Sequence, residues 1–316
     1  FWHYCRILDE LKPKAFLFEN VRGILSANKK EAWDTITHSF REVGYNLFHR
    51  VLDTAEYGVP QHRERVLMVG VRGDLEFLFP HPTHGPKSRE QAPYVSALAA
   101  IEDLQDPNEE YVSYGGKYEE ELLEIPPGMN YLHFTEKMGH SRPRFAWRSR
   151  FSDFLYVADP SMPTKTIVAQ PGKWAGPFHW NKRKFTFKEL KRLFTFPDDY
   201  RVTGAEAKKV MQLGNSVPPL LGYMMALALK QQLFGADCGI ELVDGGFVFD
   251  HDSRKGRKAV RTKKRVLPNN EVYGDCRQMQ FFEKHSPVFK SRMRFKQDLF
   301  YSSYRSCQLD RPMDGA

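Results

Sequence analysis

The N-terminal part of the chain alternates helical and strand-like hydrophobic patterns. Apolar residues recur at helical spacing over 2–11 and again over 29–43, and the second stretch stops at Gly44, a residue that favours a helix C-terminus. Between them, residues 15–19 form a short apolar run without alternation, which is typical of a buried parallel strand. Glu19 ends this strand, at the edge where open α/β sheets bind their ligands.

Two further strands are predicted at 45–52 and 65–71, and we expect them to pair antiparallel around a loop at 56–61. From about residue 72 to residue 163 the periodicity fades, and Pro, Gly, Ser and aromatic residues become frequent. We therefore predict an α/β sheet domain followed by an irregular region.

Regular structure is predicted to resume at 163–169, with a helix at about 187–197 and a last helix at about 219–233. Beyond residue 235 the pattern gives no assignment. The run 254–265 is dense in Lys and Arg, and we favour a solvated surface there over a contact with the backbone of a polyanion.

The composition is that of a globular protein. Of the 316 residues, 41% are hydrophobic and 14% aromatic, enough for a substantial core, and the formal net charge of +8 weakly favours a polyanionic partner. No apolar run approaches the length of a membrane span and no signal pattern begins the chain, so we expect a cytoplasmic protein without a membrane partner. Because the chain starts at Phe1 inside a helical pattern, we interpret it as part of a longer protein.

The cysteines do not form a metal-binding pattern. They are widely spaced, without a Cys-x-x-Cys pair, so we predict neither a metal site nor a disulfide framework. None follows a proline in a loop after a strand. The expected reduced thiols are Cys5, Cys238, Cys276 and Cys307.

Five sequence blocks follow one another in a distinctive order. They are Glu19-Asn20-Val21, Gln61-His62-Arg63-Glu64-Arg65, Pro163–Val168, Phe185–Tyr200 and Leu213–Pro219. In this order they resemble the carbon-5 cytosine DNA methyltransferases, over roughly the whole chain before its last eighty residues. The glycine-rich cofactor loop and the Pro-Cys nucleophile loop of that family do not occur in this sequence and would lie upstream. We therefore expect the C-terminal portion of such an enzyme.

The resemblance implies an α/β fold, with an incomplete Rossmann-like S-adenosylmethionine-dependent methyltransferase domain and a smaller, irregular target-recognition domain. The partial catalytic domain would cover residues 1–85 and the target-recognition domain residues 86–162. Residues 163–235 would end the recognition domain and return to the catalytic domain. Residues 236–316 would be a basic extension of unknown role.

Glu19 has a chemical role that this reaction requires. Methylation of carbon 5 needs a thiolate at carbon 6 and a proton or strong hydrogen bond at ring nitrogen 3. A partly desolvated Glu19 with a raised pKa can hold and donate that proton. Taken alone, Glu-Asn-Val often arises by chance, and a surface carboxylate is then the simpler interpretation.

Arg63 and Arg65 are two residues apart at the start of a predicted strand. We expect them to point to opposite sides, one toward the exocyclic oxygen of the base and the other toward a carboxylate or phosphate. The resemblance implies that Arg65 contacts the base, that Arg63 braces Glu19 or the DNA backbone, and that Gln61 binds nucleic acid. Glu19, Arg63 and Arg65 are thus the candidate catalytic residues. Without the resemblance, two arginines bracketing Glu64 would be an ordinary ion-pair pattern.

The last block predicts part of a cofactor site. Gly214 permits a tight turn, and Asn215 and Ser216 at the start of a helix can present amides to a carboxylate. The resemblance implies that Asn215, Ser216 and Val217 bind S-adenosylmethionine. It also implies that Thr166 contacts phosphates beside the flipped cytosine, although a strand residue without a ligand is nearly as good an interpretation.

The irregular region carries a basic and aromatic segment. Residues 139–151 set arginines among three aromatic residues, a composition suited to phosphates, guanine and stacking. A solvated basic turn is the competing interpretation. The candidate nucleic-acid contacts in this segment are Arg142, Arg144, Arg148 and Arg150.

Taken together, the sequence predicts a DNA (cytosine-5-)-methyltransferase that flips a cytosine out of duplex DNA and uses S-adenosylmethionine. We expect this chain alone to be inactive and to need an N-terminal complementary segment or subunit. One alternative is a catalytically inactive DNA-binding homologue, or the recognition subunit of a split enzyme. Another is a transfer RNA cytosine methyltransferase, although the long recognition region favours DNA.

Overall fold

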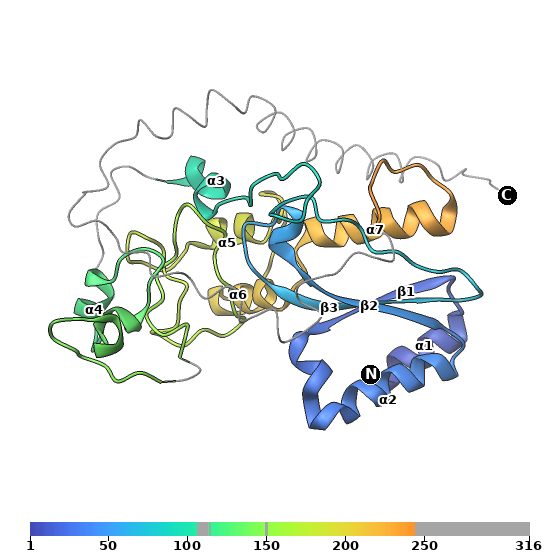
Figure 1. The fold of residues 1–316 in the computed structure, drawn as a ribbon, viewed down its shortest axis with the longest axis horizontal. Coiled ribbons are helices and arrows are strands. Elements are labelled where there is room, and N and C mark those ends of the chain that lie inside the picture. Colours follow the sequence, from blue (N-terminus) through green and yellow to red (C-terminus); the bar gives the residue numbers. More distant parts are fainter. Residues whose placement is uncertain (106–112, 114, 149–150, 244–316) are drawn as a thin grey trace. The chain divides into compact units, whose positions relative to one another are not determined.

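The predicted strands form a three-stranded sheet in the order β1-β3-β2 (Figure 1). The computed structural model describes residues 1–105, 113, 115–148 and 151–243. The strands are β1 (Ala15–Val21), β2 (Asn46–Asp53) and β3 (Glu64–Val71).

Both neighbours of β3 run antiparallel to it. The predicted antiparallel pairing of β2 with β3 is confirmed. The predicted parallel direction of β1 is wrong for its pairing with β3, because Ala15 lies opposite Val71 and Val21 opposite Arg65. The predicted burial of this strand is also wrong, since Phe16 is its only buried residue. A continuous apolar run fixes neither strand direction nor the neighbours that would bury the strand. Among the described strands, β1 is an edge strand.

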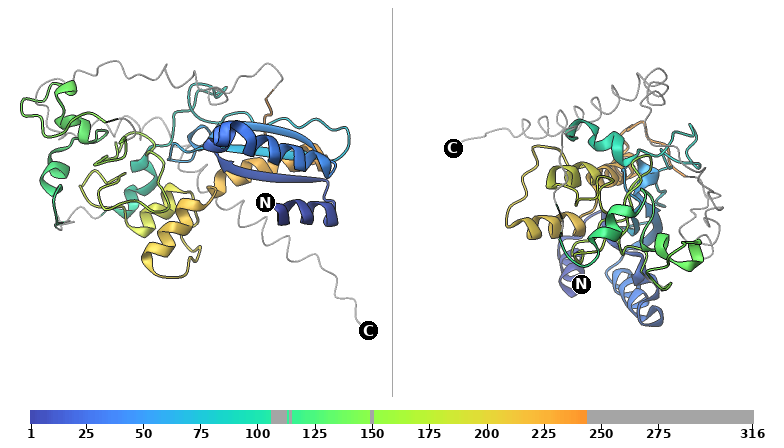
Figure 2. Two further views of the ribbon diagram at one scale, coloured as in Figure 1. Left: turned by 90° about the horizontal axis from the view of Figure 1, so that it is seen from below. Right: turned by 90° about the vertical axis from the view of Figure 1, so that its left-hand side faces the viewer.

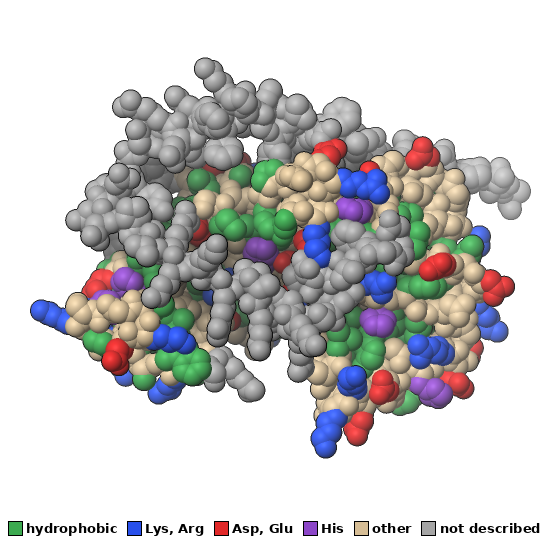
Figure 3. Space-filling model, viewed as in Figure 1, with side chains coloured by type: hydrophobic (Ala, Val, Ile, Leu, Met, Phe, Trp, Pro, Cys, Tyr) green, Lys and Arg blue, Asp and Glu red, His purple; other side chains and the backbone are tan. Residues whose placement is uncertain are grey.

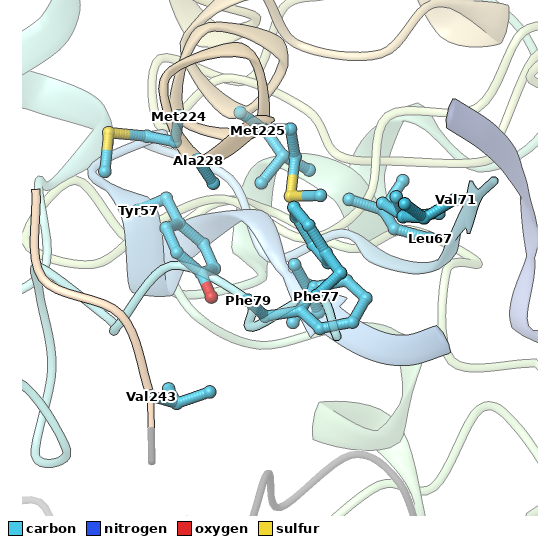
Figure 4. Packing of buried hydrophobic residues seen from close by; sticks show 12 residues of the cluster. Tyr57, Leu67, Val71, Phe77, Phe79, Met224, Met225, Ala228 and Val243 are labelled. Atoms are coloured by element: carbon cyan, nitrogen blue, oxygen red, sulfur yellow. The ribbon is translucent and has the colours of Figure 1, made fainter. Parts of the chain in front are cut away.

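The central strand β3 is buried on both faces, which explains its unbroken apolar sequence. Leu67, Val69 and Val71 belong to a core shared with α7 (Pro219–Phe234), shown in Figure 4. On the other face, Val66 belongs to a core shared with the N-terminal helices.

Those helices are α1 (Trp2–Leu11) and α2 (Glu31–Glu42), which lie on the side of the sheet opposite α7 (Figures 1 and 2). The short 3₁₀ segment η1 (Arg22–Lys30) leads from β1 into α2. The helices predicted at 2–11, 29–43 and 219–233 are confirmed as α1, α2 and α7. Helix α2 ends just before Gly44, whose φ of 87° is a conformation that glycine adopts at little cost and that often follows a helix. The result is an α/β arrangement of mixed helices and strands, as predicted.

Between β3 and α7 the chain runs mostly through loops and short helices (Figure 2). The expected helix near 187–197 is present as α5 (Phe187–Leu193). The regular structure expected at 163–169 is reduced to one bridge, between Gln61 and Thr164, so that prediction is wrong. The other short helices are α3 (Ala97–Ile101), α4 (Glu119–Glu124) and α6 (Glu206–Asn215), and the 3₁₀ segments are η2 (Thr54–Tyr57), η3 (Glu102–Leu104), η4 (Tyr131–Phe134) and η5 (Glu136–Met138).

Two further apolar clusters hold this irregular region. One joins α3, α5 and α6 through residues such as Ile101, Leu193 and Leu213. The other is aromatic and includes Tyr131 and Phe178. The region therefore has cores of its own, although it lacks a sheet among its described residues.

The contacts divide the chain into residues 1–259 and 260–316. The basic run 254–265 and the cysteines Cys276 and Cys307 lie outside the described residues. Within the described part, no helix is long and apolar enough to cross a membrane.

Candidate active site

Glu19 and Arg65 form an ion pair between neighbouring strands, with Arg65 Nε 2.8 Å from Glu19 Oε1. The register explains the contact. Arg65 lies opposite Val21, and Val21 and Glu19 are two residues apart and so share a face of the sheet. The side chains are 26% exposed for Glu19 and 11% for Arg65. The two charges are therefore largely desolvated, yet the carboxylate stays accessible.

Burial decides the protonation of this pair. It raises the pKa of Glu19 above its usual range, and this effect exceeds the opposing attraction of Arg65 and Arg63. Burial likewise lowers the pKa of Arg65, against the attraction of Glu19. Glu19 can thus hold a proton at a higher pH than an exposed glutamate.

A second ion pair supports the first. Arg22 Nη1 lies 3.0 Å from Glu64 Oε2, and Arg65 Nη1 donates to the Glu64 carbonyl at 2.8 Å. Arg22 follows β1 and Glu64 begins β3, so the pair ties the ends of two neighbouring strands. This pair was not predicted from the sequence, although Arg22 directly follows the first block and the oppositely charged Glu64 lies in the second.

Arg63 is 1% exposed. Its guanidinium donates to three backbone carbonyls: Nη1 to Ile167 at 3.2 Å, and Nη2 to Gly214 at 2.6 Å and to Ser216 at 3.1 Å. It also lies over the Phe194 ring, 5.4 Å from the centroid. Burial lowers the pKa of Arg63 to about 10.

The structure gives Arg63 partners other than the expected Glu19, because its two Nη nitrogens donate to backbone carbonyls. Arg63 and Arg65 do serve different partners, but strand alternation is not the reason. Residues two apart in one strand share a face, whereas Arg63 precedes β3, which begins at Glu64.

Gln61 and Thr166 join the start of β3 to the segment around residue 166. Gln61 is fully buried; its Oε1 accepts from the Ile167 amide at 3.0 Å and its Nε2 donates to the Leu193 carbonyl at 3.4 Å. Both ends of the Gln61 amide thus bind protein in this structure, and its expected nucleic-acid contact stays a prediction. Thr166 Oγ1 donates to the His62 carbonyl at 2.7 Å, so this hydroxyl also has a protein partner.

The segment after Leu213 ends a helix rather than beginning one. Gly214 and Asn215 are the last residues of α6, and the Ser216 amide donates to the Leu213 carbonyl at 3.0 Å. The prediction of free amides at a helix start is therefore wrong for Ser216. Gly214 is needed for close packing, since a Cβ there would lie 2.3 Å from Ala169 Cα.

Asn215 is the exposed residue of this segment, and no hydrogen bond of its side chain occurs among the described residues. Ser216 Oγ donates to the Leu213 carbonyl at 2.8 Å, and Val217 packs against the core beside α7. Of the three residues expected to bind the cofactor, Asn215 alone presents an unoccupied polar side chain.

The sequence analysis also missed a buried carboxylate, Asp53, which is 5% exposed. Asp53 Oδ1 accepts from the backbone amides of Ala55 and Arg63, and Oδ2 lies 2.7 Å from His62 Nδ1. The imidazole of His62 packs edge-on against Tyr94. Asp53 thus fixes the backbone that presents the two arginines.

The basic segment of the irregular region is only partly available to a ligand. Arg144 lies 2.8 Å from Glu124 and 3.8 Å from Glu121, and it covers the Phe134 ring. Arg142 and Arg148 are exposed. Arg150 lies outside the described residues. On the face seen in Figure 3, basic and acidic side chains are interspersed over the described surface.

A cavity of about 500 Å³ lies in the irregular region. It is lined mostly by apolar residues from 167–171, 175–177 and α6. Neither Glu19 nor Arg65 lines it. In the described part of the chain, no group of His, Cys, Asp and Glu side chains could hold a metal ion.

The family model and the relatives that match this chain are all methyltransferases. The model of the C-5 cytosine-specific DNA methylase family matches residues 1–231. Type II methyltransferase M.SacI of Streptomyces achromogenes is 40% identical over 247 residues, which cover 73% of this chain and 63% of that protein. Type II methyltransferase M.NgoFVII of Neisseria gonorrhoeae is 37% identical, over 68% of this chain and 58% of its own length.

Type II methyltransferase M.BbvI of Brevibacillus brevis is 34% identical, over 68% of this chain and 57% of its own length. The chain thus spans less than two thirds of each of these relatives.

Proposed function

Because the chain belongs to the C-5 cytosine-specific DNA methylase family, we propose that it is part of an enzyme that methylates carbon 5 of cytosine in duplex DNA. The observation that carries the proposal is the largely desolvated Glu19–Arg65 pair, with the raised pKa of Glu19. The pair suits a cytosine flipped out of the duplex, whose ring nitrogen 3 and exocyclic oxygen lie side by side.

In this mechanism Glu19 and Arg65 clamp the base. A thiolate adds to carbon 6 and pushes the electron pair of the ring toward nitrogen 3, where protonated Glu19 supplies the proton. Arg65 donates to the exocyclic oxygen and then balances the Glu19 carboxylate. After carbon 5 has taken the methyl group, nitrogen 3 returns its proton to Glu19, a base accepts the carbon 5 proton, and departure of the thiolate restores the aromatic ring.

The nucleophile is placed outside the described residues. Cys5 lies on the buried face of α1 and Cys238 follows an aspartate, so neither has the Pro-Cys context of the family. We refer below to the chain joined to the segment or subunit that carries the nucleophile and the glycine-rich loop as the complete enzyme. Two features suit such a partner: the edge position of β1, and α1 residues Trp2 and Leu11, which are 71% and 74% exposed.

S-adenosylmethionine, when bound, supplies the methyl group. In this chain the exposed amide of Asn215 fits a polar group of that cofactor, whereas Ser216 and Val217 shape the segment through its backbone and its packing. No metal is needed for this role, and we propose none.

DNA contacts are assigned to the exposed Arg142 and Arg148 and to Arg150, with Thr166 beside the base. Arg144 would first have to leave its glutamate partners. We propose residues 86–162 as the target-recognition domain and place the enzyme in the cytoplasm, where bacterial DNA lies. The relatives are named type II methyltransferases, which favours a role in restriction-modification.

The proposal is tested by transfer of a labelled methyl group from S-adenosylmethionine to unmethylated duplex DNA, with transfer RNA as the competing substrate. We expect label on cytosine of DNA with the complete enzyme and none with this chain alone. Label on transfer RNA and none on DNA would show that transfer RNA, not duplex DNA, is the substrate. DNA binding without label from the complete enzyme would point to a binding-only homologue.

A further inference from the structure

Arg63 connects three parts of the chain that are far apart in sequence. Its carbonyl partners Ile167, Gly214 and Ser216 lie 104, 151 and 153 residues away. The first belongs to the segment that returns from the recognition region, and the other two bracket Asn215. Arg63 itself is two residues before Arg65 of the base clamp.

We infer that Arg63 is a positioning residue that couples the cofactor segment, residues 213–217, to the Glu19–Arg65 clamp. Arg63 contacts neither reactant and acts by holding the cofactor segment and the clamp in a fixed relative position. Binding of one ligand therefore changes the affinity for the other. This inference rests on the proposed function, since it takes cytosine and S-adenosylmethionine as the two ligands.

The chemistry of the contact requires arginine. One guanidinium reaches Ile167 with one nitrogen and both Gly214 and Ser216 with another. An ammonium can also donate to three carbonyls, but only from one nitrogen, so lysine cannot hold two separated donor positions in a fixed fork. Burial of the charge is costly, and Nε of Arg63 is buried without a hydrogen-bond partner. An apolar side chain at this position would avoid that cost but would leave three carbonyls without this donor, so the guanidinium both satisfies these carbonyls and fixes where their segments lie.

The backbone around Arg63 is rigid enough to transmit a displacement. Its amide donates to buried Asp53 at 2.9 Å, and the neighbouring His62 amide and carbonyl both bind the 164–166 segment. Arg65 then lies inside β3, whose ladder pairs it with Val21. A shift of the Gly214 and Ser216 carbonyls therefore moves Arg63, and with it the start of the strand that carries Arg65.

The test measures the affinity of the complete enzyme for S-adenosylhomocysteine with and without duplex DNA, by equilibrium dialysis. In wild type we expect DNA to tighten that affinity by a factor within the usual range for coupled sites, about 5- to 150-fold. Arg63→Lys keeps the charge and the stem but loses the fork, and we expect its coupling factor to fall to within about twofold of unity.

Lys191→Met is the matched control. Lys191 is 7% exposed, and its Nζ donates to three carbonyls, those of Pro197, Asp198 and Tyr200, none of which belongs to the clamp or to residues 213–217. This variant should keep the wild-type coupling factor despite reduced stability. A wild-type coupling factor near unity, or an unchanged factor in Arg63→Lys, would overturn the inference.

A second measurement does not depend on whether Arg63→Lys folds. In the wild-type enzyme, duplex DNA should slow hydrogen exchange of the amides in 213–217 in the absence of cofactor, and unchanged exchange there would also overturn the inference. The proposed function fails separately, if the wild-type complete enzyme transfers no methyl group to cytosine.

Discussion

The sheet region and the irregular region satisfy their backbones in different ways. In the sheet region, residues 15–71, carbonyls and amides pair along two antiparallel ladders, and apolar clusters cover both faces. In the irregular region, residues 97–213, buried and partly buried lysines donate to carbonyls that lie outside the two ladders. These pairs are Lys182 with Ile125, Lys184 with Ala175, Lys165 with Ser152, and Lys191 with Pro197, Asp198 and Tyr200.

The comparison shows what a loop-built domain requires. Buried carbonyls need donors, and a lysine stem can cross an apolar core to supply one. The cost appears in the charge: burial lowers the pKa of Lys182 and of Lys184 to about 8 each. In the sheet region the charges instead gather at strand ends, where Glu19 and Arg65 meet and remain accessible.

The largest expected effect concerns chemistry at the sheet. Glu19→Gln in the complete enzyme removes the proton donor but keeps the shape of the side chain, so turnover should fall about 10²- to 10⁴-fold. DNA affinity should change little. Single-turnover methyl transfer and DNA binding measured on the same samples check this.

Glu64→Gln is the control for Glu19→Gln, since Glu64 is a similarly exposed carboxylate, at 22%, that pairs with Arg22. Its effect on turnover should be at least tenfold smaller. If the two variants lose turnover equally, or if Glu19→Gln loses DNA binding in proportion, Glu19 acts through structure rather than as a proton donor.

Stability should be lost most sharply at a buried cation of the irregular region. Lys191→Met leaves the carbonyls of Pro197, Asp198 and Tyr200 without this donor, and an unsatisfied buried group costs about 1–3 kcal/mol. Chemical denaturation of the complete enzyme measures the change. Lys188→Met, on the exposed side of the same helix, should stay within about 0.5 kcal/mol, and an equal loss there would show that the carbonyl contacts are unimportant.

Gly214→Ala tests the packing between α6 and the segment of Ala169. The new Cβ would lie 2.3 Å from Ala169 Cα, so backbone must shift, and overpacking of this kind costs about 1–3 kcal/mol. Gly222→Ala in α7 meets nothing within 4 Å and should instead raise stability by about 0.5–1 kcal/mol. Denaturation midpoints of the two variants that move in the same direction would contradict this interpretation.

The sequence predicts most of the sheet region because its information is local. Helical and strand spacing over 2–71 predicted both α-helices and all three strands there, but not the 3₁₀ segments η1 and η2. The motif that contains Arg65 predicted a residue that does meet Glu19. The direction of β1 relative to β3 was not predicted correctly, because an apolar run carries no information on strand direction.

The contacts of Arg63 could not be predicted, because they depend on where segments more than a hundred residues away pack. Gly214 was assigned a turn, whereas the packing of a distant residue, Ala169, requires it. In the irregular region the lysines carry no spacing pattern, since each donates to a carbonyl that only the folded chain brings near.

The smallest expected effect is a pH dependence that separates the two regions. The folded pKa of Lys184 is about 8, below its ordinary 10.5, so between these values the unfolded chain binds more protons than the folded one. Stability should therefore rise with pH in this window. One pKa unit corresponds to about 1.4 kcal/mol, and for a side chain that retains some exposure we expect a rise on the order of 1 kcal/mol.

Comparison with Lys184→Met isolates this rise from other titrations, since Met keeps an apolar side chain of similar length but removes the ammonium that lies over the Phe178 ring. Measurements from pH 8 to pH 9.5 also avoid Tyr156, whose pKa burial raises to about 12 and whose effect has the opposite sign. The exposed Lys208→Met should retain the wild-type slope of stability against pH. If Lys184→Met keeps the wild-type slope of stability against pH, the contact of Lys184 with the Ala175 carbonyl leaves the ammonium solvated. The irregular region would then not depend on its lysine donors as the sheet region depends on its ladders.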